Sequence, residues 1–140
     1  MTLEPFKLYH IELMKAQGVQ SAQQREVSHV PSRWANVGTA LTAREGERII
    51  ACGGVVHIHP GMGLLWAVLS EAAGTHMTWL HRATIRFLEI NPPRRLEATV
   101  EKGFIQGCRW LTLLGFEFEG EMAAYGIDGE THLRYGRVRP

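Results

Sequence analysis

The sequence predicts a strand–helix–strand crossover between Leu64 and Val100, in the middle of the chain. The run LLWAVLS, residues 64–70, is apolar without alternation, which is typical of a strand covered on both faces. Residues 75–90, THMTWLHRATIRFLEI, repeat apolar side chains at helical spacing, and residues 94–103, RRLEATVEKG, alternate apolar with more polar ones. Two strands joined through a helix imply a parallel pair inside the sheet.

The flanking segments predict further helices and strands around this crossover. Two helices come first, YHIELMKAQG (residues 9–18) and SAQQREVSHVP (residues 21–31). A hairpin of RWANVGTALTA and RIIACGGVVHIH follows. After the crossover, FIQGCRWLTLLG is a helix ending on Gly115, and FEFEGEMAAYGI and ETHLRYGRV are strands around Asp128-Gly129. The order predicts an α/β fold with a mixed sheet flanked by helices.

Length, charge and composition exclude several classes of protein. The 140 residues fit a single domain, residues 1–140, and a hydrophobic content of 45% is that of an ordinary globular protein. A net charge of +1 supplies no bulk field to recruit nucleic acid. The longest uncharged apolar run, Gly61–Leu69, is shorter than the about 20 residues that cross a bilayer, so we expect no membrane partner. Cys52 and Cys108 form no C-x-x-C pattern, which favours buried reduced thiols in a cytoplasmic protein.

The stretch from about Gly53 to Val138 resembles the GNAT superfamily of N-acetyltransferases. In that family a helix ends in a Leu-Gly-Phe-Glu type sequence that leads directly into the sixth strand, and residues 114–117 here read LGFE. The small branch found near the internal virion genes of short-tailed phages looks closest in length and in the pieces WAV-S and RWL-LLGF. The resemblance implies a fold whose fourth and fifth strands are parallel and splay apart.

The resemblance also implies a cofactor and a reaction. In the family, backbone groups exposed by the splay pair with the pantetheine arm of acetyl-CoA, and the loop after the fourth strand offers backbone amides to the pyrophosphate. The acetyl group would pass to a primary amine of a small molecule or of another protein. If the chain is phage-encoded, this reaction would take place in the host cytoplasm. The positions that would bind the cofactor are Leu69, Ser70, Gly74, Thr75, His76, Phe104 and Gly107.

The phosphate-binding loop departs from the family pattern Q/R-x-x-G-x-G/A. Gly74 keeps the central glycine, whereas Glu71 replaces Gln or Arg and His76 replaces the small last residue. A carboxylate about 4 Å from a diphosphate costs on the order of 4 kcal/mol at a surface-like dielectric. A helix N-terminus stabilises a nearby anion by only about 0.3–1 kcal/mol. We therefore expect phosphate binding only if Glu71 turns outward, or if His76 and Arg82 supply countercharge.

The last helix also departs from the family. Leu111 stands where the family often places the tyrosine that protonates the leaving thiolate, so Tyr125 or Tyr135 of the last hairpin would have to serve. Phe104 replaces a frequent asparagine. Gly107 retains the small residue that permits close approach of cofactor or strand.

Candidate bases for the acceptor amine are His57, His59 and Glu71. The two histidines alternate and share one face of their strand, where they could act as a substrate-side base, hold a metal, or form an ordinary exposed pair. Ser70 could bond substrate or cofactor, or cap the following helix.

The departures keep a second function open. A protein of the same fold without catalytic activity could act in virion assembly or bind a host protein, because fold alone does not determine function. The exposed edges of the first and last strands would also allow a homodimer.

Overall fold

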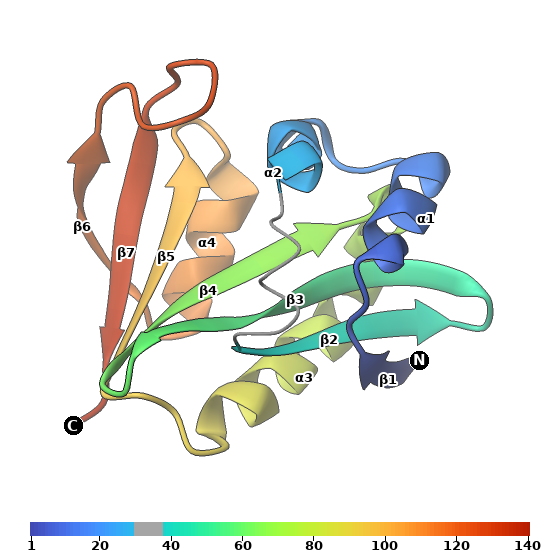
Figure 1. Cartoon of the computed structure of the whole chain (residues 1–140), viewed down its shortest axis with the longest axis horizontal. Coiled ribbons are helices and arrows are strands. Elements are labelled where there is room, and N and C mark those ends of the chain that lie inside the picture. Colours follow the sequence, from blue (N-terminus) through green and yellow to red (C-terminus); the bar gives the residue numbers. More distant parts are fainter. Residues whose placement is uncertain (30–37) are drawn as a thin grey trace. The chain divides into compact units, whose positions relative to one another are not determined.

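The computed structural model describes residues 1–29 and 38–140 of the chain. Its strands form a mixed sheet in the order β1-β2-β3-β4-β5-β7-β6, with β4 and β5 parallel (Figure 1). This confirms the predicted α/β fold class. Along the chain the elements are β1 (Thr2–Pro5), α1 (Tyr9–Gln17), η1 (Ser21–Gln23), α2 (Gln24–His29), β2 (Gly38–Glu45), β3 (Arg48–His59), β4 (Met62–Leu69), η3 (Glu71–His76), α3 (Met77–Glu89), β5 (Arg95–Glu101), α4 (Ile105–Leu113), β6 (Glu117–Met122) and β7 (His132–Val138).

Contacts between residues divide the chain into two compact units, and the single domain remains a prediction. The first unit comprises residues 1–57 and 65–80, and the second comprises residues 58–64 and 81–140. Both β3 and β4 therefore contribute residues to each unit.

The first unit begins with a strand that the sequence analysis missed. β1 pairs antiparallel with β2, with Thr2 opposite Arg44 and Pro5 opposite Leu41. Four residues that include a proline are too few to show strand alternation, so the pairing with β2 decides the conformation. The strand predicted at residues 33–43 corresponds to β2, and its residues 33–37 lie outside the described part of the chain.

The two predicted N-terminal helices are present with changed bounds. α1 ends at Gln17, next to the predicted stop at Gly18, whose φ of 92° suits glycine. The second helix opens with the 3₁₀ turn η1, in which the Gln23 N–H donates to the Gln20 carbonyl at 2.8 Å, and α2 follows. Residues 30 and 31 of the predicted helix lie outside the described residues.

β3 supplies much of the core of the first unit. Residues 49–52 and 54–56 are buried and only Gly53 between them is half-buried, as expected for a strand covered on both faces. A Cβ at Gly54 would lie 2.3 Å from the carbonyl oxygen of Thr39 and 2.6 Å from Cα of Ala40. The close approach of β2 and β3 therefore requires a glycine at this position.

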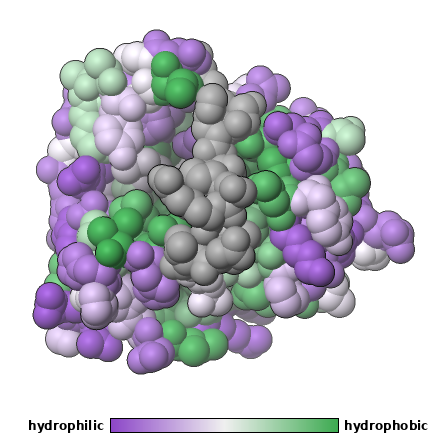
Figure 2. Space-filling view, in the orientation of Figure 1, coloured by the Kyte–Doolittle hydropathy of each residue, from purple (hydrophilic) through white to green (hydrophobic). Residues whose placement is uncertain are grey.

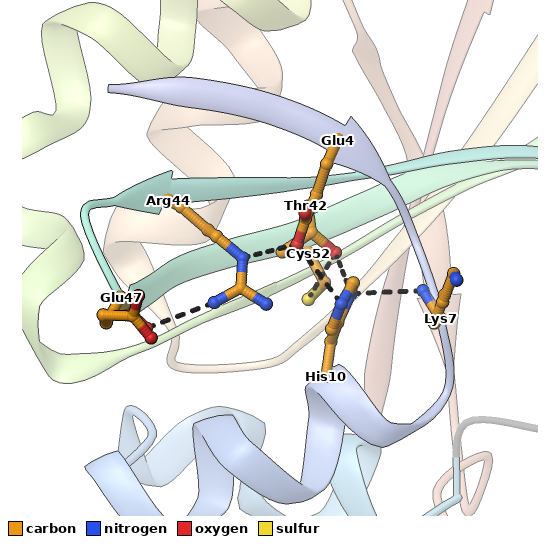
Figure 3. A network of polar contacts seen from close by, with 7 residues as sticks. All are labelled: Glu4, Lys7, His10, Thr42, Arg44, Glu47 and Cys52. Atoms are coloured by element: carbon orange, nitrogen blue, oxygen red, sulfur yellow. Dashed lines mark hydrogen bonds and ion pairs between the residues drawn. The ribbon is translucent and has the colours of Figure 1, made fainter.

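A buried polar network joins α1 to β1 and β2 (Figure 3). His10 is 1% exposed, its Nδ1 lies 2.8 Å from Thr42 Oγ1, and its Nε2 lies 3.3 Å from Glu4 Oε1. The backbone N–H of Lys7 donates to His10 Nδ1 at 3.1 Å, so the neutral ring carries its hydrogen on Nε2, facing Glu4. Arg44 bonds the same carboxylate.

Burial lowers the pKa of His10, and the opposing effect of the Glu4 carboxylate is smaller. The unfolded chain takes up a proton on this imidazole below about pH 6.5, whereas the folded chain does so only at lower pH. The folded state therefore loses stability as the pH falls from about 6.5 toward the folded pKa. The pKa of Glu4 is also lowered, chiefly by its hydrogen bond from Arg44. This carboxylate therefore affects the stability of the folded state only at more acidic pH.

The two cysteines are free, and they differ in exposure. Cys52 is buried at 3.4 Å from Thr42 Oγ1, and burial raises the pKa of its thiol to about 12. Cys108 is half-buried, so the expectation of two buried thiols is wrong for this residue. It lies on α4, where one side of the helix remains accessible.

The second unit is built on the antiparallel pairs β5–β7 and β7–β6. Leu96, Ala98 and Val100 of β5 are buried and alternate with half-buried residues, as the sequence predicts. β6 is the last strand of the sheet order and carries exposed Glu117, Glu119 and Glu121, with a bulge between Phe118 and Gly120. Arg95 of β5 donates to the carboxylate of Glu119 at 3.0 Å.

α4 ends as the sequence predicts, in a left-handed glycine cap. Gly115 has a φ of 91°, and its N–H donates to the Thr112 carbonyl at 3.0 Å. The N–H of Phe116 donates to the Leu111 carbonyl at 3.0 Å, which completes a Schellman motif. Phe116 is 2% exposed, so its burial fixes the direction in which β6 leaves the helix.

Among the described residues, no helix combines the length and the apolar character that crossing a bilayer would require. Exposed large hydrophobic side chains occur in both units, and hydrophobic residues lie among hydrophilic ones on the face shown in Figure 2.

Candidate functional site

The end of β4 is the first feature of the candidate site. The pairing between β4 and β5 covers Met62–Leu64 opposite Arg95–Glu97, and β4 itself continues to Leu69. The N–H of Ser70 donates to the carbonyl of Ile50 in β3 at 2.9 Å. Because successive residues of a strand point their backbone groups to opposite edges, those of Ala67 and Leu69 face away from β3. We call this part of β4, from Leu65 to Leu69 on the side away from β3, the open edge.

The open edge is bonded by the segment between α1 and α2. The side-chain amide of Gln23 donates to the Ala67 carbonyl at 3.3 Å, and its oxygen accepts from the Leu69 N–H at 3.1 Å. Gln23 is 5% exposed. The N–H of Gln20 donates to the Leu69 carbonyl at 3.4 Å, and Val19 forms an antiparallel bridge with Ser70. Neither glutamine was predicted, because no motif in QSAQ, residues 20–23, marks them.

Ser70 is buried without a partner for its hydroxyl. It precedes η3 and is 0% exposed, yet its side chain makes no capping hydrogen bond. In the described residues its Oγ has no hydrogen-bond partner. The structure thus does not support the capping role, and it leaves a buried hydroxyl at the C-terminal end of β4.

The carboxylate of Glu71 is turned toward the end of α1. A Cβ added to Gly18 would lie 2.9 Å from Oε2 of Glu71, and the Glu71 N–H donates to the Gly18 carbonyl at 3.2 Å. By contrast, Gly74 is exposed, and apart from its chain neighbours no atom of the described residues lies within 4 Å of a Cβ added to it. The carboxylate of Glu71 therefore does not lie against the central glycine of the loop.

The other polar residues of the loop have partners inside the first unit. Thr75 Oγ1 donates to the Ala72 carbonyl at 3.2 Å within the turn. His76 Nε2 lies 3.3 Å from Oε2 of Glu45, so a protonated His76 would form an ion pair with that carboxylate. The loop then enters α3 at Met77.

In the second unit, Phe104 and Gly107 lie against each other. Phe104 precedes the first turn of α4, and a Cβ at Gly107 would lie 2.9 Å from Cδ2 of Phe104 and 2.8 Å from Cγ2 of Val100. The missing side chain of Gly107 therefore admits strand β5 and the Phe104 ring. The structure thus shows the approach of a strand, and the approach of a cofactor to Gly107 stays a prediction.

The two candidate acids of the last hairpin differ in burial. Tyr125 is 53% exposed, and its ring packs on His132 at a centroid distance of 5.3 Å. Tyr135 is buried in β7, and burial together with its hydrogen bond to Cys108 raises the pKa of Tyr135 to about 12. A phenol with this pKa keeps its proton at neutral pH.

His57 and His59 are exposed at the end of β3. His59 Nδ1 accepts a hydrogen bond from the Gly61 N–H at 3.1 Å. Within residues 1–29 and 38–140, no group of three His, Cys, Asp or Glu side chains is placed to hold a metal ion.

Comparisons with known proteins identify the fold. At the level of sequence, no family model and no curated protein matches the chain. An acetyltransferase of the GNAT family from Streptococcus pneumoniae aligns with a TM-score of 0.70 at 14% identity, covering 99% of each chain. An N-acetyltransferase from Staphylococcus aureus Mu50 aligns with a TM-score of 0.71 at 12% identity, covering 98% of this chain and 96% of that one.

A third solved structure is a variant of a spermidine N-acetyltransferase from Vibrio cholerae. It aligns with a TM-score of 0.66 at 13% identity, covering 99% of this chain and 95% of that one. These likenesses extend over nearly the whole chain, beyond the stretch from Gly53 in which the sequence resembled the superfamily. The chain therefore has the GNAT fold.

Proposed function

We propose that the protein is an N-acetyltransferase that uses acetyl-CoA and a primary amine. The observation that carries the proposal is the interruption of the parallel pair: β4 continues past its last pairing with β5 at Leu64, in a GNAT fold. The likeness to solved N-acetyltransferases, one of them named for spermidine, supports an amine as acceptor.

The loop after β4 fits the phosphates of acetyl-CoA. A Cβ at Gly74 would meet none of the described residues beyond its chain neighbours, and the adjoining turn leads into a helix of 13 residues, whose N-terminal amides favour an anion. The carboxylate of Glu71 lies near Gly18 and not against Gly74, which supports one of the two conditions expected to allow phosphate binding. Leu69, Ser70, Gly74, Thr75 and His76 would hold the cofactor, with Phe104 and Gly107 as further candidates. Bound acetyl-CoA would supply the activated thioester.

The proton transfers would fall to this chain's own side chains. An attacking amine must first lose a proton, and Glu71, His57 and His59 are the proposed acceptors for it. Tyr125 would protonate the leaving thiolate through its phenol, with the protonated Tyr135 as the alternative. Direct transfer of the acetyl group to the amine also requires that the site bind the acceptor and exclude water.

A second candidate function is a binding protein of the same fold that does not use acetyl-CoA. The observation that favours it is the Gln23 carboxamide, which already bonds Ala67 and Leu69 on the open edge. Descent from the phage branch, a cytoplasmic location and a homodimer also remain proposals from the sequence.

Thermal unfolding with and without acetyl-CoA tests the proposed function. Acetyl-CoA at about 100 times its dissociation constant should stabilise the protein by roughly 2.7 kcal/mol and raise the Tm. Release of free CoA thiol in the presence of spermidine or a lysine-containing peptide would then show transfer. No rise in Tm at millimolar acetyl-CoA, with no CoA in the purified protein, would refute the acetyltransferase and favour the binding protein.

A further inference from the structure

The side chain of Gln23 bonds two backbone groups that belong together on one strand edge. Gln23 donates to the Ala67 carbonyl and accepts from the Leu69 N–H, at 3.3 Å and 3.1 Å. A carbonyl and an N–H two residues apart on one edge are the pair that a neighbouring strand, or any extended amide, would use. The side-chain amide of Gln23 therefore makes the hydrogen bonds that the backbone amide of a neighbouring strand would make.

We infer that Gln23 closes the open edge of β4 and must leave it before the amide-bearing arm of acetyl-CoA can bind there. This rests on the proposed function, which assigns acetyl-CoA to the protein. The backbone N–H of Leu69 has a single hydrogen to donate, so the Gln23 oxygen and a ligand carbonyl compete for it. The free protein keeps the edge satisfied, because an unpaired buried N–H is costly.

The arrangement lets Gln23 leave without detaching the segment that carries it. Gln20 and Gly18 bond Leu69 and Glu71 through backbone groups, independently of the Gln23 side chain. The turn η1 is held by its own hydrogen bond from the Gln23 N–H to the Gln20 carbonyl. Rotation about the side-chain torsions of Gln23 would break both of its bonds to β4 while these backbone bonds stay in place.

A matched pair of variants tests this closing role. Gln23→Ala removes the competing amide, whereas Gln20→Ala removes the same chemical group from a residue that contacts β4 through its backbone. Binding of CoA is measured by calorimetry, and exchange of the Leu69 amide hydrogen is measured by NMR in the free protein. Two fragments, 4′-phosphopantetheine and 3′,5′-ADP, separate the arm of the cofactor from its nucleotide.

We expect Gln23→Ala to expose the Leu69 amide to faster exchange and to lower the Tm of the free protein. Its dissociation constant for CoA should fall by about 5- to 100-fold, as expected when two neutral hydrogen bonds no longer compete. The gain should be seen with 4′-phosphopantetheine and be absent with 3′,5′-ADP. Gln20→Ala should bind all three ligands as the unmodified protein does.

Several results would overturn the inference. Equal or weaker CoA binding by Gln23→Ala, or unchanged exchange at Leu69, would show that Gln23 does not close the edge, while leaving the acetyltransferase intact. Absence of CoA binding to both proteins would refute the acetyltransferase and the competition with it. Binding by Gln23→Ala alone would support the closing role of Gln23 and would count against acetyl-CoA as a substrate of the unmodified protein. If the alanine variant fails to fold, Gln23→Met keeps the length of the side chain without its amide and answers the same question.

Discussion

Replacing Gly74 by glutamate should weaken the binding of acetyl-CoA without disturbing the fold. The residue is exposed, and within the described part of the chain no atom beyond its chain neighbours lies within 4 Å of a Cβ at this position, so the new side chain makes no close contact there. Surface substitutions of this kind usually change the free energy of unfolding by less than about 0.5 kcal/mol. A loss of acetyl-CoA binding in this variant would therefore reflect a change at the binding site and not unfolding of the protein.

The magnitude follows from the added charge. A carboxylate about 4 Å from a phosphate charge costs about 1 kcal/mol at the dielectric of water and about 4 kcal/mol at an effective dielectric of 20. The dissociation constant should therefore rise by roughly 5-fold to 1,000-fold. Raising the ionic strength should shrink the effect, because salt screens exposed charges.

Calorimetry at two salt concentrations, with Gly74→Gln as the uncharged control of similar size, checks this reasoning. The glutamine variant should bind acetyl-CoA nearly as well as the unmodified protein. Equal losses in both variants would mean that bulk, and not charge, is responsible. Unchanged binding by Gly74→Glu would show that the phosphates lie elsewhere, which would remove Gly74 from the site.

Two further predictions concern stability. Burial lowers the pKa of His10, so the unmodified protein should lose stability below about pH 6.5 more steeply than His10→Gln. The difference in slope, measured by chemical unfolding at several pH values, should reach up to about 1.4 kcal/mol per pH unit. Parallel pH profiles of the two proteins would contradict this. Gly115→Ala should lower the free energy of unfolding by about 1–2 kcal/mol, measured by urea titration, because the φ of 91° strains a residue with a Cβ; an unchanged midpoint would show that the cap does not require glycine.

The sequence predicted those elements whose signal is local and repeated. The strand at residues 48–59 has the predicted bounds, and the cap at Gly115 forms as its glycine indicated. β1 was missed because four residues carry no pattern, and because its partner strand β2 lies far away in the sequence. Cys108 was misjudged because apolar neighbours in sequence do not tell which side of a helix is covered.

The candidate site was predictable only in part. Residues from Ser70 to His76 could be located because they form one contiguous loop after a recognisable strand. The direction of the Glu71 side chain depended on Gly18, which lies far away in sequence. Gln23 could not be found, because one side chain bonding Ala67 and Leu69 leaves no periodic or spaced signal.

The acidic last strand has a consequence for self-association. Glu117, Glu119 and Glu121 would meet identical carboxylates if two copies aligned their β6 strands antiparallel, and the bulge after Phe118 would break the register. At the opposite end of the strand order, β1 offers only four residues for such an alignment. Growth of the sheet from one copy into the next is therefore disfavoured at both ends.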